Sequence, residues 1–134
     1  MGTFSIPIRV YVEDTDAGGI VFYANYLKYM ERARTEWLRS LGIELDDVQR
    51  EQGTLFVVRS VNIDYQSPAR FNEQLQATFE LDQVKRASLQ CQQFVMREST
   101  ILTQASVTLV CVNADTLTAC AIPQSIKEAM TVEY

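Results

Sequence analysis

Apolar side chains alternate with other residues near the start of the chain and again through most of its second half. The first alternating face comprises Ile6, Ile8, Val10 and Val12, a pattern typical of a half-buried β-strand over residues 6–12. After Gly53, further strand-like runs occupy residues 55–65, 74–85, 88–98 and 101–113. The junctions between these runs are short, and short junctions favour antiparallel neighbours. The pattern therefore predicts one early strand and, later, an antiparallel meander of four strands.

A different period occupies Asn25–Leu41, where apolar residues recur three and four positions apart, as in an amphipathic helix. Asn25 is a favourable N-cap residue, and Gly42 is the residue type expected just after a helix ends. A shorter helical segment is predicted at residues 44–51, and residues 122–130 are expected to form a closing turn or a helix. One long helix among antiparallel strands indicates an α+β fold rather than an alternating α/β fold. The apolar stripe of the helix needs a sheet to cover it, and its members are Tyr26, Tyr29, Met30, Ala33, Trp37, Leu38 and Leu41.

The length of 134 residues suits a single domain spanning residues 1–134. The formal charge of −5 and the lack of a basic stripe argue against a nucleic-acid partner. The longest uncharged run, residues 99–114, is too short and too polar for a membrane span. The first residues lack the charged and apolar regions of a signal peptide, so we expect a cytoplasmic protein.

Histidine is absent from the chain. A Ser-His-Asp triad, a Cys-His dyad and a histidine-ligated metal are therefore excluded within one copy, and any acid or base must be another side chain or water. The odd number of cysteines, without metal-binding spacing, indicates reduced thiols. We interpret Cys91 and Cys111 as small buried apolar side chains, and we expect neither a metal site nor a cofactor.

The segment Glu13–Tyr26 carries the densest set of candidate chemistry. Three acids fall within four positions, two glycines follow, and the predicted helix then begins. A helix start offers unpaired N–H groups and a positive dipole end. A carboxylate beside oriented N–H donors suits acyl transfer. The alternative, which the residues alone favour, is a solvated acidic turn before a capped helix.

The stretch DTDAGGIVFYANY at residues 14–26, followed by ERAR at 31–34, resembles the hotdog-fold 4-hydroxybenzoyl-CoA thioesterase family. It is most similar to the branch of Tol-Pal-associated acyl-CoA thioesterases. Similar stretches occur at residues 56–59, 65–70, 110–113 and 122–123. The resemblance implies one long central helix wrapped by a curved antiparallel sheet of five or six strands. It also implies hydrolysis of an acyl-CoA thioester to the free acid and CoA.

The resemblance assigns the catalytic carboxylate to Asp16, as nucleophile or as general base for water, and the oxyanion-binding backbone N–H to Tyr23. Gly19 and Tyr26 belong to the same motif and are expected at the substrate site. Many members of the branch carry histidine at the position of Tyr23, whereas hydroxybenzoyl-CoA members carry an aromatic residue there. In members with aromatic substrates, an acid at the position of Glu31 lines the pocket; the alternative is an acid on the helix surface beside Thr35.

The phosphates of CoA require local cations in an acidic protein. The junction that contains Lys85, Arg86 and Ser88 is the best cluster for this purpose, with Arg59 as a weaker candidate. The alternative is a solvated hairpin tip. Because a single curved sheet leaves edge strands open to a second copy, we expect a homodimer. The resemblance adds the possibility of a tetramer built as a dimer of dimers.

Two other functions compete with the thioesterase. A hotdog hydratase uses a histidine with a carboxylate, and this chain lacks histidine. A non-catalytic acyl-CoA-binding or assembly protein would have lost activity with Tyr23 in place of histidine. The presence of Asp16 and both glycines argues against that alternative.

Overall fold

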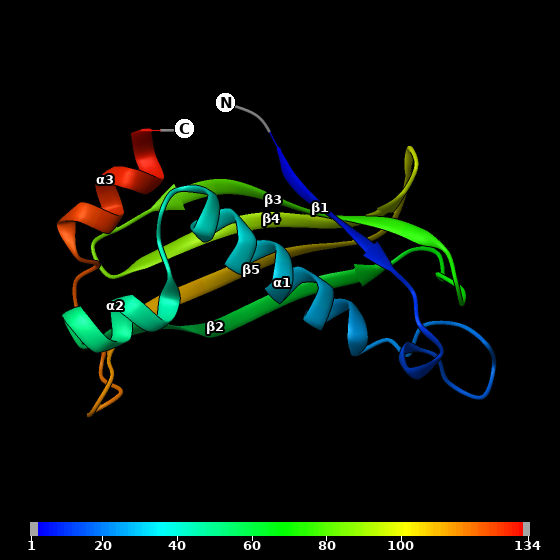
Figure 1. The fold of residues 1–134 in the computed structure, drawn as a ribbon, viewed down its shortest axis with the longest axis horizontal. Helices are drawn as coiled ribbons and strands as arrows, with labels where there is room; N and C mark the ends of the chain where they lie inside the picture. Colours follow the sequence, from blue (N-terminus) through cyan, green and yellow to red (C-terminus); the bar gives the residue numbers. More distant parts are fainter. Residues whose placement is uncertain (1–2, 133–134) are drawn as a thin grey trace.

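A five-stranded antiparallel sheet curves around one long helix in the computed structural model, which describes residues 3–132 (Figure 1). The strands are β1 (Phe4–Arg9), β2 (Thr54–Tyr65), β3 (Gln74–Val84), β4 (Ser88–Arg97) and β5 (Thr100–Asn113). The helices are α1 (Asn25–Ser40), α2 (Leu45–Gln52) and α3 (Gln124–Val132), with a 3-10 turn at Val12–Asp14. The predicted α+β class and all five predicted strand segments are confirmed.

The order of strands in the sheet is β1-β3-β4-β5-β2, so the predicted meander of four strands is wrong for β2. Strand β2 pairs with β5 at the far edge, with Tyr65 opposite Thr103, and does not pair with β3. The junction after β2 pairs with the loop that precedes α1: the carbonyl of Ala69 accepts the N–H of Val21 at 2.9 Å, and Arg70 bridges to Ile20. A junction held against another loop cannot form the hairpin that its length suggested.

Strand β1 is shorter than the predicted strand over residues 6–12. The chain leaves the sheet after Arg9 and enters the 3-10 turn, where the carboxylate of Asp14 accepts the N–H of Tyr11 at 2.8 Å. Val10 remains buried, but Val12 is 69% exposed, so its placement on the buried face is wrong. The turn redirects the chain toward the loop that precedes α1.

Helix α1 buries the predicted apolar stripe and ends one residue early, before Leu41. Gly42 has φ of +84°, as expected of the residue that terminates a helix. The N-cap prediction is wrong: Ala24 occupies the cap without a side-chain hydrogen bond, and Asn25 is the first helical residue. The Asn25 side chain instead donates from Nδ2 to the carbonyl of Asp14 at 2.8 Å. It therefore ties the start of the helix to the acidic loop.

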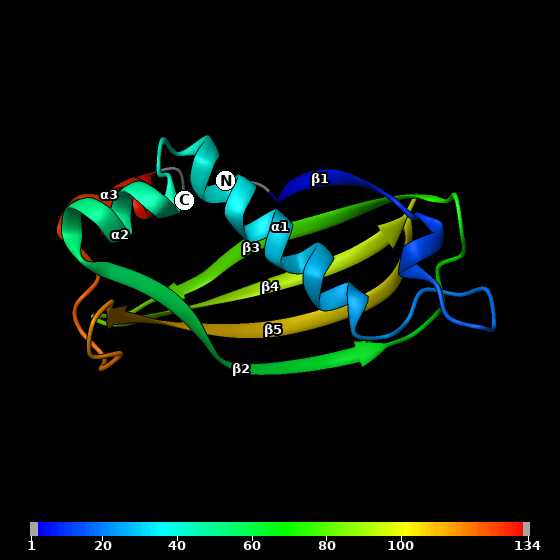
Figure 2. The same cartoon turned by 60° about the horizontal axis from the view of Figure 1, so that its bottom comes forward.

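The core lies between α1 and the concave face of β1, β3 and β4 (Figure 2). Trp37 of α1 stacks on Phe79 of β3, with ring centroids 4.1 Å apart. The concave face near β2 leaves apolar side chains exposed, including Val58 and Val61. Within residues 3–132, none of the helices is both long and apolar enough to cross a membrane.

Candidate active site

The segment between the 3-10 turn and α1 folds back on itself as a narrow loop. Thr15 bridges to Val21, and the N–H of Phe22 donates to the carbonyl of Asp14 at 2.9 Å. At the tip, Gly19 donates its N–H to the carbonyl of Asp16 at 3.0 Å and has φ of +79°, a conformation that favours glycine. The loop thus brings the acidic residues alongside the residues that lead into α1.

The carboxylate of Asp16 is exposed at the tip of this loop. Its Oδ1 accepts the N–H of Gly18 at 2.8 Å. Within the described residues, no hydrogen bond or ion pair engages its Oδ2. One oxygen is therefore held in place while the other is open to a water molecule or a substrate.

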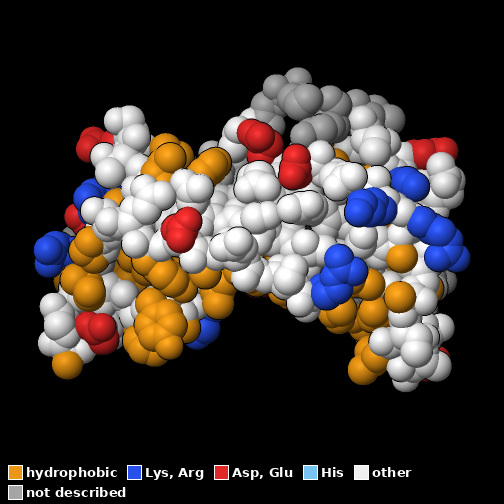
Figure 3. Space-filling model, turned by 180° about the vertical axis from the view of Figure 1, so that it is seen from behind, with side chains coloured by type: hydrophobic (Ala, Val, Ile, Leu, Met, Phe, Trp, Pro, Cys, Tyr) orange, Lys and Arg blue, Asp and Glu red, His pale blue; other side chains and the backbone are white. Residues whose placement is uncertain are grey.

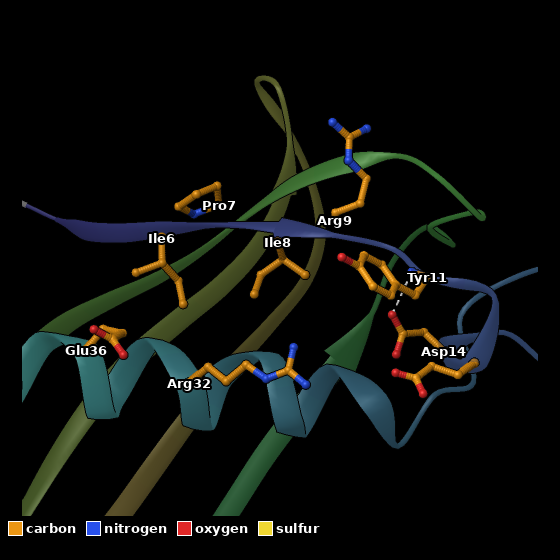
Figure 4. A pocket seen from close by; sticks show the side chains of 9 residues that line it. Ile6, Pro7, Ile8, Arg9, Tyr11, Asp14, Arg32 and Glu36 are labelled. Atoms are coloured by element: carbon orange, nitrogen blue, oxygen red, sulfur yellow. Dashed lines mark hydrogen bonds between the residues drawn. The ribbon is translucent and has the colours of Figure 1, made fainter.

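The carboxylate of Asp14 is engaged on the other side of the loop. Figure 4 shows it beside Tyr11 at one end of a groove between β1 and α1, with the hydrogen bond from the Tyr11 N–H drawn. This groove of about 370 Å³ also contains Arg32 and Glu36 from α1. Burial, together with the Asp14 carboxylate, raises the pKa of Tyr29. The two neighbouring acids therefore differ in their surroundings, because Asp14 is half-buried and acts on Tyr29, whereas Asp16 is exposed.

Tyr23 lies in the turn immediately before α1, and its side chain is 62% exposed. In the part of the chain that the structure describes, no acceptor is paired with its backbone N–H. The next N–H along the helix start, that of Ala24, is likewise unpaired there. Both lie at the positive end of the α1 dipole, which favours a developing negative charge.

Three tyrosines surround a cavity of about 280 Å³ beside this helix start: Tyr23, Tyr26 and Tyr65. The ring of Tyr65 lies 5.9 Å from that of Tyr23 and 5.7 Å from that of Tyr26, both edge to face. The buried hydroxyl of Tyr26 accepts the N–H of Ala69 at 3.0 Å. Burial raises the pKa values of Tyr26 and Tyr65. The lining is therefore neutral and mostly apolar, which suits an acyl group.

Tyr65 is a site residue that the sequence does not indicate. Its stretch resembles the family, but nothing in the sequence shows that the end of β2 meets the start of α1. The lining residues of this cavity include neither Gly19 nor Glu31. Glu31 is exposed on α1, and its Oε2 accepts the hydroxyl of Thr35 at 2.7 Å. This is the contact expected of an acid on the helix surface.

Arg59, Lys85 and Ser88 line one small cavity on the face of the sheet away from α1. Figure 3 shows this face, with Lys and Arg side chains gathered toward the end that carries the β3–β4 turn. Arg86 does not line the cavity. The 11 residues of β3 separate the turn from the end where β1 leaves the sheet, a span on the order of 30 Å. One copy of the chain therefore does not bring these cations to Asp16.

Comparison with known proteins places the chain in a family. The Thioesterase-like superfamily matches residues 10–130. The acyl-CoA thioesterase YbgC of Haemophilus influenzae is 41% identical over 126 residues, which cover 94% of this chain and 93% of that protein. The crystal structure of a probable thioesterase from Bartonella henselae is similar with a TM-score of 0.87 and 28% identity, covering 91% of this chain and 100% of that one.

A 4-hydroxybenzoyl CoA thioesterase, solved with 4-hydroxybenzoyl CoA, has a TM-score of 0.89 at 20% identity over 95% of this chain and 97% of its own. At that identity the likeness concerns the fold alone. The chain belongs to the Thioesterase-like superfamily and has the hotdog fold. The predicted family, fold and enzyme class of thioester hydrolases are thereby confirmed.

Proposed function

We propose that this protein hydrolyses acyl-CoA thioesters, with Asp16 as the catalytic carboxylate and the Tyr23 backbone N–H as the oxyanion donor. The observation that carries the proposal is the contrast between the two acids of the loop. Each carboxylate accepts one backbone N–H, but Asp14 is half-buried and acts on Tyr29, whereas Asp16 is exposed at the tip of the loop. Sequence identity of 41% to a relative named as an acyl-CoA thioesterase supports the reaction class.

In this proposal, the acyl group enters the cavity beside the start of α1. Asp16 either removes a proton from the attacking water or attacks the thioester carbonyl itself. The carbonyl oxygen becomes negative and accepts the N–H of Tyr23. The C–S bond then breaks and CoA leaves as its thiolate, a good leaving group that requires no metal. On the covalent route, water then hydrolyses the anhydride between the acyl group and Asp16. A single turnover in water enriched in heavy oxygen tests for this route, because only an anhydride that water opens at the Asp16 carbonyl carbon leaves the label in Asp16.

A second copy of the chain completes the proposed substrate site. Strand β2 is 12 residues long, and among the described residues no strand pairs with its outer edge. Exposed Val57, Val58 and Val61 lie along it. When two such edges pair antiparallel about a two-fold axis, the Tyr65 end of one strand lies beside the Thr54 end of the other. The cations of one copy then approach the active-site loop of its partner.

The test is turnover of short-chain, long-chain and aromatic acyl-CoA substrates, followed by release of the free CoA thiol. Asp16→Asn keeps an oxygen that accepts the Gly18 N–H, so we expect normal folding and a fall in kcat of roughly 10² or more. Asp14→Asn and Glu31→Gln are the matched controls, and each is expected to keep kcat within a few-fold. Near-normal kcat in folded Asp16→Asn protein would refute the assignment.

The competing function is non-catalytic binding of acyl-CoA by the same fold. It predicts calorimetric binding of acyl-CoA by the wild-type protein without release of thiol from any substrate in the panel. Turnover that is lost in the Asp16→Asn variant excludes it.

A further inference from the structure

Two cysteines face each other at the end of the sheet opposite the active-site loop. Cys111 lies near the end of β5, and Cys120 lies in the segment that returns antiparallel to it. The N–H of Cys120 donates to the carbonyl of Cys111 at 2.9 Å, and Val112 bridges to Ala119 next to them. The two cysteines are therefore directly opposed, which places their Cα atoms about 5.5 Å apart. That separation lies within the range of natural disulfides.

The side-chain positions of Cys111 and Cys120 also favour a disulfide. The two sulfur atoms are 3.8 Å apart, in van der Waals contact. The third cysteine, Cys91, is buried on β4, and its sulfur is paired with Gln93 instead. The distances thus single out one pair of thiols for a covalent bond, and they provide an internal control.

The two thiols of the pair differ in reactivity. Cys111 is buried, and burial, with a smaller contribution from the adjacent Cys120 thiol, raises its pKa to about 11. Cys120 is partly exposed and can meet a reagent from solvent. Because Cys120 is the more accessible of the two, it is the thiol that reacts first with an oxidant, and Cys111 is the neighbour that resolves the product.

We propose that Cys111 and Cys120 are an oxidation site that forms an intramolecular disulfide when the protein meets a peroxide. The Cys120 thiolate attacks one oxygen of hydrogen peroxide, the O–O bond breaks, and the products are Cys120 sulfenic acid and hydroxide. The Cys111 sulfur then attacks the Cys120 sulfur. The S–O bond breaks, and hydroxide leaves with the proton of the Cys111 thiol as water. Two thiols are oxidised and one peroxide is reduced to two waters.

The disulfide also acts on the turn that carries the candidate CoA-binding cations. The N–H of Cys111 donates to the carbonyl of Ala87 at 2.8 Å, and the N–H of Ile122 donates to the carbonyl of Arg86 at 2.9 Å. The two segments joined by the bond therefore each donate a hydrogen bond to the β3–β4 turn. A disulfide between them stabilises the folded protein by lowering the conformational entropy of the unfolded chain. It also links covalently the two segments that contact this turn.

The experiment uses the full chain, treated with hydrogen peroxide, quenched, denatured and alkylated with N-ethylmaleimide. We expect one alkylated cysteine in place of three, an unalkylated mass lower by about 2 Da for the two lost hydrogens, and a cross-linked peptide joining residues 111 and 120. The melting temperature of the oxidised protein should rise by about 5 °C, and a reductant should reverse the change.

Three variants make the outcome decisive. Cys91→Ala should form the same disulfide between Cys111 and Cys120 as the wild type, and it should therefore retain no alkylatable thiol. Cys120→Ser should retain two alkylatable thiols after the same treatment. In Cys111→Ala the Cys120 sulfenic acid has no resolving thiol, so this variant should keep one alkylatable thiol and gain about 16 Da for each oxygen added. Neither variant should show a rise in melting temperature. The proposal is refuted by any of three wild-type results: retention of all three thiols, stable addition of oxygen to Cys120, or a disulfide between two copies. These readouts do not depend on turnover, so they stand apart from the proposed hydrolase activity.

Discussion

The glycines of the active-site loop offer a sharp test, because the structure gives them different constraints. A Cβ added to Gly18 would lie 3.2 Å from Oδ1 of Asp16, whereas a Cβ added to Gly19 would have no atom within 4 Å. Gly18 does not have positive φ, but Gly19 has φ of +79°. Substitution at Gly18 therefore acts on the carboxylate, and substitution at Gly19 acts on the backbone.

The expected magnitudes follow from these two constraints. In Gly18→Ala, the carboxylate oxygen must shift by a few tenths of an ångström; since a misplacement of about 1 Å costs about 10² in rate, we expect kcat to fall about three- to tenfold. Its melting temperature should not fall, because glycine-to-alanine changes at compatible φ are stabilising by about 0.4–1 kcal/mol. Gly19→Val forces a β-branched residue into the left-handed region, at a cost of about 1–2 kcal/mol or more. It should lower both the melting temperature and kcat.

The assay combines thermal unfolding with steady-state release of the CoA thiol. Tyr23→Phe is the reference variant, because it keeps the backbone N–H and the ring, and its kcat should stay within a few-fold of wild type. If Tyr23→Phe abolishes turnover while Gly19→Val is tolerated, the backbone role is wrong and the phenol is the catalytic group. If Gly18→Ala leaves kcat unchanged, the position of the Asp16 carboxylate does not limit the reaction.

Three further predictions concern the rest of the molecule. Lys85→Ala should raise KM for acyl-CoA in a salt-dependent manner, with little change in kcat. Arg86→Ala should raise KM less, because Arg86 does not line the small cavity. If both variants keep the wild-type KM, the turn is a solvated hairpin tip and does not bind CoA. Sedimentation should show at least a dimer, and a stable, active monomer at micromolar concentration would contradict the shared site. Burial raises the pKa of Cys91 to about 12, so its contribution to stability is complete below the ordinary thiol pKa and is lost as pH rises from about 9. Over that range Cys91 alone should lower the free energy of unfolding by about 1.4 kcal/mol per pH unit, and in Cys91→Ala the fall should be shallower by this amount.

Local patterns were sufficient for the elements of this fold. The period of the apolar residues placed α1 within one residue at its C-terminal end, and alternation placed the later strands within one or two residues. Both periods express which face of an element is buried, and that information lies in neighbouring residues. The DTDAGG stretch likewise indicated the family, because a loop with fixed turn geometry constrains its own sequence.

The sequence did not determine the partner of β2 or the role of Asn25. Strand pairing depends on contacts between distant segments, and here residues 69–70 are held by the loop that precedes α1. Asn25 matches the preference for an N-cap, but the carbonyl of Asp14 competes for its side chain. In both places a tertiary hydrogen bond prevailed over a local preference.

The candidate site shows the same division. Sequence alone placed carboxylates, glycines and a helix start in one segment, because these groups are neighbours along the chain. Only the tertiary structure distinguished Asp16 from Asp14, because Asp14 is half-buried and acts on Tyr29 while Asp16 is exposed. Only the tertiary structure brought Tyr65 to Tyr23 and moved the Lys85 cluster to the far end of the sheet. The physical reason is that the pairing of distant strands decides which residues meet, and this pairing is not encoded in the local sequence around a side chain.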